Sequence, residues 1–496
     1  MIRRLFLGLG GSVLVLSALV VGNTWRQGSR QLEVAPVAPL ALDAAAIAQR
    51  LAGSLRFATI SSLDQPDLNA DQFRQFHAYL RQHYPLTHAK LQLESVGGLS
   101  LLYTWPGQDP SAKPVLWLAH QDVVPVAPGT DKNWQAQPFA GEVKDGFVWG
   151  RGAWDNKGNL IAQLEAVEHL LAQGFTPRQT VYLAFGADEE VGGLRGAVAI
   201  VKALQAKGVK LDYVLDEGLL VTDGVMPGLK QPAALIGIAE KGYLSVVLKV
   251  PATPGHSSMP PPKGTSAIAM MSAALRRLED EQLPAHIRGV AREMFETIAP
   301  EMGGFNRYAL SNLWLFGPVV QSQLEKGAST NAMLRTTTAL TMVNAGNKDN
   351  VLPGEALATV NFRLLPGDSI ARVMDHVKQQ AGNDRFELYA LPGSAEPSPV
   401  SPTQAPAYQR LNRTIREVFP GTLVAPGLMV GATDSRHFQA ISDHIYRFSP
   451  VRAKPEDLPR FHGTNERIST DNLLEMVRFY LQLLKNTSAA PSSETH

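Results

Sequence analysis

The sequence predicts an α/β protein with a mainly parallel sheet, into which a smaller α+β domain is inserted. Strand, helix and strand alternate through the first half of the chain, a pattern typical of parallel sheets. The alternation then gives way to a half-exposed strand at Leu244–Val250, where every second residue is apolar. With 496 residues, the chain is also too long for one ordinary hydrophobic core.

The elements of the first half follow from their apolar patterns. In one helix, Leu160, Leu164, Val167 and Leu171 recur at helical spacing. Short continuous apolar runs instead predict buried strands. Helices are expected at Ala44–Phe57, Asp71–His83, Asn159–Leu171 and Leu194–Leu204, and strands at Pro114–Ala119, Thr180–Phe185 and Leu211–Leu215.

The second half supplies the inserted domain and the return to the main domain. A helix at Thr265–Leu278 and a strand at Leu357–Arg363 are expected in the insertion, and helices at Ile370–Gln380, Ala407–Val418 and Asp471–Leu484 are expected to complete the main domain. The predicted divisions are a leader at 1–25, a tether at 26–45, the main domain at 46–240 and 366–485, the inserted domain at 241–365, and a polar tail at 486–496.

The leader has the composition of an export signal. Arg3 and Arg4 precede an uncharged stretch, Leu5–Trp25, that is about long enough to span the hydrocarbon core of a membrane. Arg26 and Arg30 close this stretch, which disfavours a buried helix of the folded domain. We therefore expect either a retained membrane anchor or a cleaved signal, with the rest of the chain outside the cytosol.

Composition excludes several classes of function. The chain is 45% hydrophobic and 18% charged with a net charge of +1, which is typical of a globular protein and gives no indication of a nucleic-acid partner. It contains no cysteine, so disulfides, thiolate nucleophiles and cysteine zinc sites are excluded. There is no Gly-x-Ser-x-Gly motif of a serine hydrolase. A metal site would need histidine and carboxylate ligands.

Such side chains stand at the ends of the three predicted strands. His120 ends the first strand, Glu189 and Glu190 follow the second, and Asp216 closes the third. Parallel strands place their carboxyl ends at one edge of the sheet, where open α/β sheets have their sites. Asp122, two residues after His120, can accept the free imidazole N–H. A lone histidine is usually structural, but three such coincidences indicate a site.

A glycine-rich loop at residues 150–158 contributes another acid. It lacks the Gly-Lys-Ser/Thr ending of a phosphate-binding loop. Its glycines would let the backbone approach Asp155, whose two oxygens could bridge two cations. The alternative is that Asp155 only caps the following helix.

The acidic run Asp188-Glu189-Glu190 is costly unless cations lie near it, because like charges repel. It is consistent with one glutamate on a metal and its neighbour free as a base. The alternative is an ordinary solvated run of acids.

In combination, these motifs resemble the co-catalytic zinc aminoacylases and carboxypeptidases, which include carboxypeptidase G, aminoacylase, the desuccinylase, N-fatty-acyl-amino acid hydrolase relatives and, most closely, carboxypeptidase S. The resemblance covers about residues 50–485. The matching motifs are His120-x-Asp122, Trp134-x-x-x-Pro138-Phe139, Gly150–Gly158, Glu189-Glu190-x-Gly192, Leu215-Asp216-Glu217-Gly218, Pro254-Gly255-His256-Ser257-Ser258 and Phe461-His462-Gly463-Thr464-Asn465-Glu466.

The resemblance implies two zinc ions per subunit. The implied ligands are His120 and Asp216 on one ion, Glu190 and His462 on the other, and Asp155 between them. Glu217 is an alternative to its neighbour Asp216. Two imidazoles among the ligands favour zinc over magnesium, although manganese or cobalt suits such a set as well.

The resemblance also implies the catalytic roles. Glu189 matches the family's general base, Asp122 its histidine-orienting aspartate, and His256 a histidine that holds the oxyanion from the inserted lid domain. Substrate-holding positions are matched by Asn331, Arg363 and Arg436. The fold that it implies is a mainly parallel-sheet zinc-peptidase catalytic domain with an inserted α+β lid and dimerisation domain.

The expected activity is zinc-dependent hydrolysis of an amide bond that releases a C-terminal or N-acylated amino acid, with a small peptide or N-acyl amino acid as substrate. The expected assembly is a homodimer through the lid domain, with the membrane contacted by the leader. The alternatives are a membrane-tethered binding protein with an inactive metal site and, among enzymes, an N-fatty-acyl amino acid hydrolase instead of a peptide carboxypeptidase.

Overall fold

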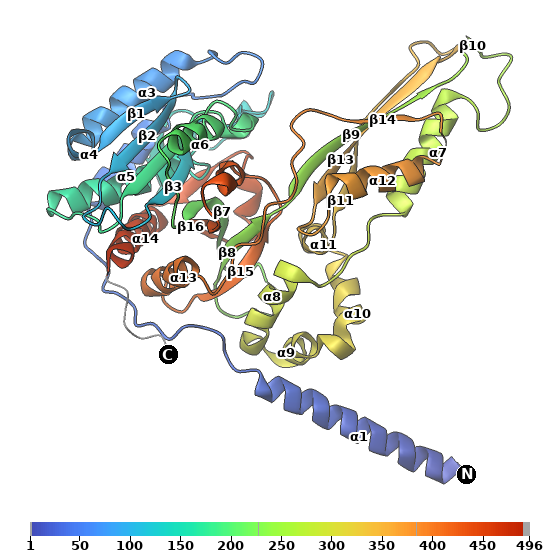
Figure 1. Cartoon of the computed structure of the whole chain (residues 1–496), viewed down its shortest axis with the longest axis horizontal. Coiled ribbons are helices and arrows are strands. Elements are labelled where there is room, and N and C mark those ends of the chain that lie inside the picture. Colours follow the sequence, from blue (N-terminus) through green and yellow to red (C-terminus); the bar gives the residue numbers. More distant parts are fainter. Residues whose placement is uncertain (1, 227, 383, 490–496) are drawn as a thin grey trace.

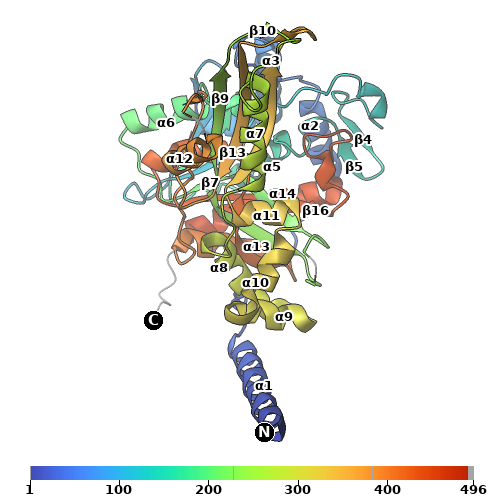
Figure 2. The same ribbon diagram turned by 90° about the vertical axis from the view of Figure 1, so that its right-hand side faces the viewer.

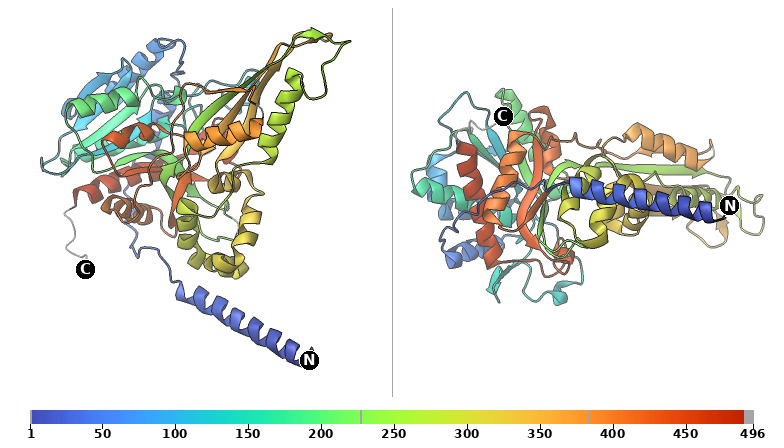
Figure 3. Two further views of the ribbon diagram at one scale, coloured as in Figure 1. Left: turned by 45° about the vertical axis from the view of Figure 1, so that its right-hand side comes forward. Right: turned by 90° about the horizontal axis from the view of Figure 1, so that it is seen from below.

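The structure is a computed structural model that describes residues 2–226, 228–382 and 384–489. It contains two bodies (Figures 1 and 3), the main domain around an eight-stranded sheet and the inserted domain around a four-stranded sheet. Both the predicted fold class and the existence of the insertion are confirmed.

The main sheet has the strand order β1-β2-β6-β3-β7-β16-β8-β15. Strand β3 pairs in parallel with β6 and with β7, so the three predicted strands are neighbours, and β7 continues past its predicted end at Leu215 to Thr222. The strands are β1 (Gln92–Val96), β2 (Ser100–Trp105), β3 (Val115–His120), β6 (Val181–Gly186), β7 (Val214–Thr222), β8 (Ala233–Glu240), β15 (Leu423–Met429) and β16 (Ile445–Ala453).

Helices cover both faces of this sheet, as buried parallel strands require. One face packs against α2, α5, α13 and α14 through a core that includes Trp117, Leu164 and Tyr480, and the other packs against α6. The helices are α2 (Ala44–Ser54), α3 (Ala70–His83), α4 (Pro85–Lys90), α5 (Lys157–Ala172), α6 (Ala197–Ala206), α13 (Pro406–Val418) and α14 (Thr470–Ser488).

A small antiparallel sheet beside the main one joins two distant motifs. Strand β5 (Phe147–Trp149) pairs with β4 (Glu142–Lys144) on one side and with β17 (Arg467–Ser469) on the other. The glycine-rich loop begins directly after β5, and the Phe461–Glu466 motif ends directly before β17. The two motifs are thereby brought side by side.

The inserted domain is an antiparallel sheet in the order β11-β13-β9-β14, with two helices packed on one face. A two-stranded ribbon, β10 (Gly255–His256) with β12 (Val351–Leu352), lies at its outer tip (Figure 1). The other elements are β9 (Gly242–Pro251), α7 (Ala267–Asp280), β11 (Thr337–Ala345), β13 (Glu355–Leu364), α12 (Ile370–Ala381) and β14 (Glu387–Ala390).

The predicted end of the insertion at residue 365 is wrong. Helix α12, assigned from sequence to the main domain, buries Val373 and Val377 in the core of the inserted domain, and β14 pairs with β9. The inserted domain therefore continues to about residue 390. An amphipathic period shows that a helix has a buried face, but it does not show which sheet covers that face.

A group of four helices within the insertion was not predicted. It comprises α8 (Gly289–Ile298), α9 (Gly304–Ser311), α10 (Leu313–Leu324) and α11 (Ala328–Leu334). Met294 and Phe295 of α8 share a buried cluster with Ala425 of β15. The insertion thus reaches back to the edge strand of the main sheet.

The leader forms α1 (Ile2–Arg26), which projects from the body on the side away from β10 (Figure 2). Its last turn is tied to the inserted helices, because Asn23 Nδ2 donates to Ser311 O at 2.8 Å. Within the described residues, no helix is both long and apolar enough to cross a membrane. The predicted membrane-spanning anchor is therefore not supported.

The predicted tether and tail are more ordered than expected. Gln31 exchanges hydrogen bonds with the backbone of Val424, so the segment after α1 lies along the edge strand β15. At the other end, α14 continues to Ser488, and Asn486 donates to Glu417 Oε2 at 2.7 Å. Residues 490–496 lie outside the described residues.

Candidate metal centre

Two imidazoles face the two oxygens of one carboxylate at the edge of the main sheet. His120 Nε2, at the end of β3, lies 2.9 Å from Asp155 Oδ1. His462 Nε2 lies 2.7 Å from Asp155 Oδ2. The structure thus brings together the three residues predicted for the bridged pair, and Asp155 stands between the histidines as a bridging ligand would.

A further glutamate lies on each side of Asp155. Glu190 Oε2, just past β6, is 3.5 Å from His462 Nε2, and Glu217 Oε1, on β7, is 3.2 Å from His120 Nε2. The site therefore has two halves, His120 with Glu217 and His462 with Glu190, that share Asp155.

These donors fit zinc. The ligand atoms of His120, Asp155 and Glu190 lie within 4.8 Å of one another, as do those of His120, Glu189 and Glu217. Within the described residues, Glu190 Oε1 is buried and has no hydrogen-bond partner. Imidazole and carboxylate donors suit zinc, and a buried acceptor without a donor needs a cation or another compensating group.

Glu217 occupies the position that the sequence assigned to Asp216. The Asp216 carboxylate is turned away from the histidines, where it accepts the amide N–H groups of Glu217 and Ser435, each at 2.8 Å. Successive residues of a strand point to opposite faces, so only one of the two acids can face His120. The geometry therefore favours Glu217, the alternative that the sequence left open, over Asp216 as the acid that faces His120.

Asp122 connects the histidine to the acidic turn. His120 Nδ1 lies 2.9 Å from the Asp122 carbonyl oxygen and 3.3 Å from Asp122 Oδ1. The same carboxylate accepts the amide N–H groups of Glu189 at 3.2 Å and Glu190 at 3.0 Å. Asp122 thus contacts the His120 ring and also hydrogen-bonds to the backbone of the turn that carries both glutamates.

The charges of the site show why it requires positive partners. Burial, together with the nearby Asp155, raises the pKa of Glu217 to about 8. Hydrogen bonds to Asp155 and Glu190 raise the pKa of His462 to about 10. Burial acts to lower the pKa of His120, but Glu217 and the other acids raise it well above its ordinary value. The clustered acids thus produce a negative electrostatic potential that attracts a cation.

Glu189 lies beside these acids, in the half of the site that contains His120. Burial raises its pKa well above the ordinary value of a glutamate, and Glu217, Asp434 and Glu190 add to that rise. Its carboxylate lies within 4.8 Å of the donor atoms of His120 and Glu217. A raised pKa is what a carboxylate needs in order to take up and release a proton near neutral pH.

The predicted residues of the insertion are spread over its length. His256 is exposed on β10 at the outer tip (Figures 1 and 2), where its Nδ1 lies 2.8 Å from Ser258 Oγ. Within its own chain, His256 is thus not brought to the metal centre. Asn331 lies on α11 and is half-buried, and its Oδ1 atom has no hydrogen-bond partner among the described residues.

The two predicted arginines belong to different domains. Arg363, near the end of β13, lies over the Tyr243 ring with 4.8 Å between the guanidinium carbon and the ring centroid. Burial lowers the pKa of Arg363, and the charge of Arg436 lowers it as well. Arg436 donates to Gly192 O at 3.2 Å, two residues past Glu190.

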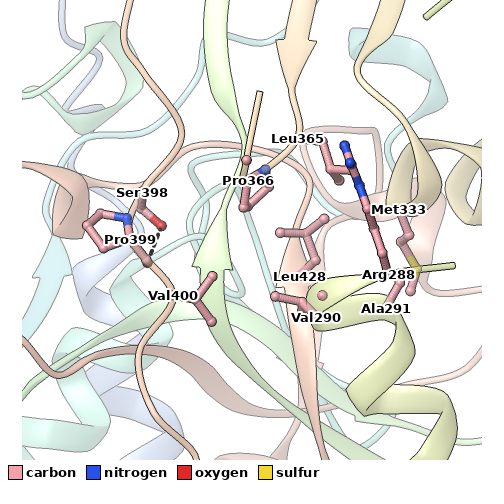
Figure 4. Close-up of a pocket in the computed structure, with 12 residues that line it drawn as sticks. Arg288, Val290, Ala291, Met333, Leu365, Pro366, Ser398, Pro399, Val400 and Leu428 are labelled. Carbon is pink, nitrogen blue, oxygen red and sulfur yellow. Dashed lines mark hydrogen bonds between the residues drawn. The ribbon is translucent and has the colours of Figure 1, made fainter. Parts of the chain in front are cut away.

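A cavity of about 440 Å³ lies at the joint between the two domains (Figure 4). Its wall is mostly apolar, and none of the predicted site residues lines it. Leu365 and Met333, which do line it, follow Arg363 and Asn331 by two residues each.

Sequence reasoning missed side chains that hold the ligands. Asn156 Nδ2 donates to Glu217 Oε2, and Arg151 pairs with Glu466 through Nη1 and Oε2 at 2.6 Å. In the glycine-rich and Phe461–Glu466 motifs, roles were predicted from sequence only for the ligands Asp155 and His462. Asn156, Arg151 and Glu466 belong to the same motifs. Their polar side chains within buried loops were the available signal.

A mainly parallel sheet that carries two histidines and two glutamates around a shared aspartate is typical of a metal-dependent hydrolase. Comparison identifies the family: residues 116–486 match the model of peptidase family M20/M25/M40. The chain belongs to this family and is a zinc-dependent hydrolase of amide bonds.

Its relatives include two kinds of named protein. The chain is 43% identical to the N-fatty-acyl-amino acid synthase/hydrolase PM20D1 of Xenopus tropicalis, over 91% of this chain and 88% of the relative. It is 40% identical to the probable carboxypeptidase S-like 2 of Dictyostelium discoideum, over 98% and 93%. The fold matches the metallo-carboxypeptidase Sso-CP2 of Sulfolobus solfataricus with a TM-score of 0.64 and 20% identity, over 89% and 99%.

Proposed function

We propose that this protein hydrolyses N-acyl amino acids with a large apolar acyl group, using two zinc ions held by five side chains. The proposed ligands are His120, Asp155, Glu190, Glu217 and His462. The observation that carries the proposal is the position of Asp155, whose two oxygens face His120 and His462 at 2.9 and 2.7 Å.

Bound zinc would polarise the scissile carbonyl and lower the pKa of a water molecule. Glu189 takes the proton of the attacking water, since its carboxylate lies beside the His120 half of the site and its pKa is raised by burial. It then delivers this proton to the leaving amine. Asp122 holds His120 and the turn that carries Glu189 in fixed relative positions, because it hydrogen-bonds to both.

The two arginines would bind the carboxylate of the substrate. Arginine presents paired donors in a planar fork that matches a carboxylate. Arg436 is held beside the acidic loop by Gly192 O, and Arg363 approaches from the inserted domain. Asn331 supplies a further amide on α11. This arrangement favours substrates with a free terminal carboxylate over internal peptide bonds.

The apolar cavity favours the N-acyl reading over the dipeptide reading. It is about 440 Å³ in volume, and Leu365 and Met333 in its wall lie two residues from Arg363 and Asn331 in the sequence. Apolar clefts of a few hundred Å³ are typical of small-molecule sites. The name of the Xenopus relative also refers to N-fatty-acyl amino acids. We assign the apolar part of the substrate to this cavity.

The oxyanion donor would come from a second copy of the chain. His256 is exposed at the tip of the inserted domain, so a homodimer through this domain could bring the histidine of one protomer to the metal centre of the other. The complete active site would therefore form only in the dimer.

The leader would direct the chain out of the cytosol. Arg3 and Arg4 followed by an uncharged stretch are typical of export signals. Sequencing the N-terminus of the protein recovered from cell fractions tests this proposal, and recovery of the intact chain in the cytosol alone would contradict it.

The test of the activity is a substrate panel on the zinc-loaded protein. N-acyl phenylalanines from acetyl to oleoyl, and dipeptides with the same C-terminal residue, are compared by kcat/KM. The proposal expects kcat/KM to rise with acyl length and to exceed that for the dipeptides. Preference for dipeptides would make the protein a peptide carboxypeptidase, and no turnover of either class would leave a binding protein.

A further inference from the structure

The two loops that carry Asp155 and His462 are joined by one buried ion pair. Glu466 is fully buried, and Arg151 is 2% exposed. Their side chains meet with 2.6 Å between Arg151 Nη1 and Glu466 Oε2. Arg151 lies in the glycine-rich loop, four residues before Asp155, and Glu466 lies four residues after His462.

Each partner also binds the backbone of the other's loop. Glu466 Oε1 accepts the amide N–H groups of Gly152 at 3.0 Å, Trp154 at 2.9 Å and Asp155 at 3.0 Å. This carboxylate therefore fixes the backbone that presents the bridging aspartate. A buried charge is stable only when it is paired and hydrogen-bonded, and both conditions are met here.

In the other direction, Arg151 Nη2 donates to His462 O at 3.1 Å and Gly463 O at 3.0 Å. His462 has φ 57° and Asn465 has φ 61°, left-handed values that residues other than glycine rarely adopt. Such a conformation persists only when its surroundings hold it. The Arg151 fork provides that support at the ligand histidine itself.

The pairing of β5 with β17 also holds one end of each loop in place. Trp149 of β5 pairs with Arg467 of β17. The adjacent residues, Gly150 and Glu466, are also joined, because Gly150 N donates to Glu466 O at 3.0 Å. The two loops thus leave one small sheet and are locked together again by the buried pair.

We infer that Arg151 and Glu466 are positioning residues that set the distance between Asp155 and His462, and with it the zinc affinity of the His462 half of the site. This inference rests on the proposed ligand set. It concerns residues that touch neither substrate nor metal and act through the two ligand loops.

The experiment measures zinc affinity, not turnover. The metal-free full chain is titrated with zinc in competition with a chromophoric chelator, for wild type, Glu466→Gln and Arg151→Lys. Loss of groups that orient metal ligands weakens metal binding by about 10- to 100-fold. We expect a loss in this range at the His462 position in both variants, and a smaller loss at the other position, which shares Asp155 but keeps His120 and Glu217.

The Arg50–Glu165 pair is a matched control. Glu165 is also buried and accepts from Arg50 Nη2 at 2.7 Å, but it lies on α5, outside both ligand loops. Glu165→Gln should lower the melting temperature of the metal-free protein as the other variants do, and should leave both zinc affinities at the wild-type value.

The outcomes separate the inference from the proposed function. Wild-type zinc affinities in folded Glu466→Gln and Arg151→Lys would overturn the inference and leave the ligand set intact. If Glu466→Gln does not fold, Arg151→Lys decides, because it keeps the charge and loses only the fork. A wild-type chain that binds no zinc would overturn both.

Discussion

The main sheet and the inserted domain hold their functional residues in different ways. In the main domain, His120 at the end of β3, Glu190 just past β6 and Glu217 within β7 meet within a few ångströms. In the inserted domain, His256 lies exposed at the outer tip and Arg363 lies at the joint with the main domain. The first region makes a site by its own topology, whereas the second requires a partner or a substrate to complete one.

The largest expected effect tests the role given to Glu189. Glu189→Gln should reduce kcat by about 10²- to 10⁴-fold, because the glutamine cannot take the proton of the attacking water. Zinc content and kinetics are measured on the same sample. Loss of a zinc ion would make Glu189 a ligand, and unchanged turnover would remove it from the reaction.

The next test distinguishes the two neighbouring acids on β7. Glu217→Gln should remove or greatly weaken one zinc position, because Glu217 faces His120. Asp216→Asn should keep both positions, since the Asp216 carboxylate binds the amides of Glu217 and Ser435. Equilibrium dialysis with zinc measures both variants, and the reverse result would restore the ligand assignment based on sequence.

A smaller effect is expected from the substrate arginines. Arg436→Lys should lower kcat/KM for N-acyl amino acids by about 10- to 100-fold, the equivalent of one charge-assisted hydrogen bond. The corresponding C-terminal amides should change little, because they never make the charged contact. Equal losses for acids and amides would show that Arg436 has a structural role instead.

The smallest signal is expected from hybrid dimers. Mixing His256→Ala with Glu189→Gln protomers should restore a fraction of the activity, because one of the two sites in a hybrid has both an intact base and an intact partner histidine. Native mass spectrometry confirms that the protomers exchange. Hybrids that form and remain inactive would mean that His256 does not act across a dimer.

The difference between the two regions also explains what the sequence could predict. The helix at Asn159–Leu171 and the strands that end at His120 and Phe185 were expected within a few residues, because buried strands and helices leave continuous or periodic apolar patterns. Parallel strands then place their ends together without further information. The main part of the site was predictable for this reason.

What escaped prediction depends on contacts between distant segments. The choice between Asp216 and Glu217 is set by the pleat of β7, and the domain assignment of α12 is set by the sheet that covers Val373. Helix α8 packs against β15, a strand over a hundred residues away in sequence. Local apolar periodicity carries none of this information.

The most direct test of the account is a crystal structure of the zinc-soaked protein with anomalous difference density at the zinc edge. The account predicts two zinc peaks, one on each side of the Asp155 carboxylate, one contacted by His120 and Glu217 and the other by His462 and Glu190. Glu189 should lie beside the pair without binding either ion. A single peak, or a peak coordinated by Asp216 or Glu189, would contradict it.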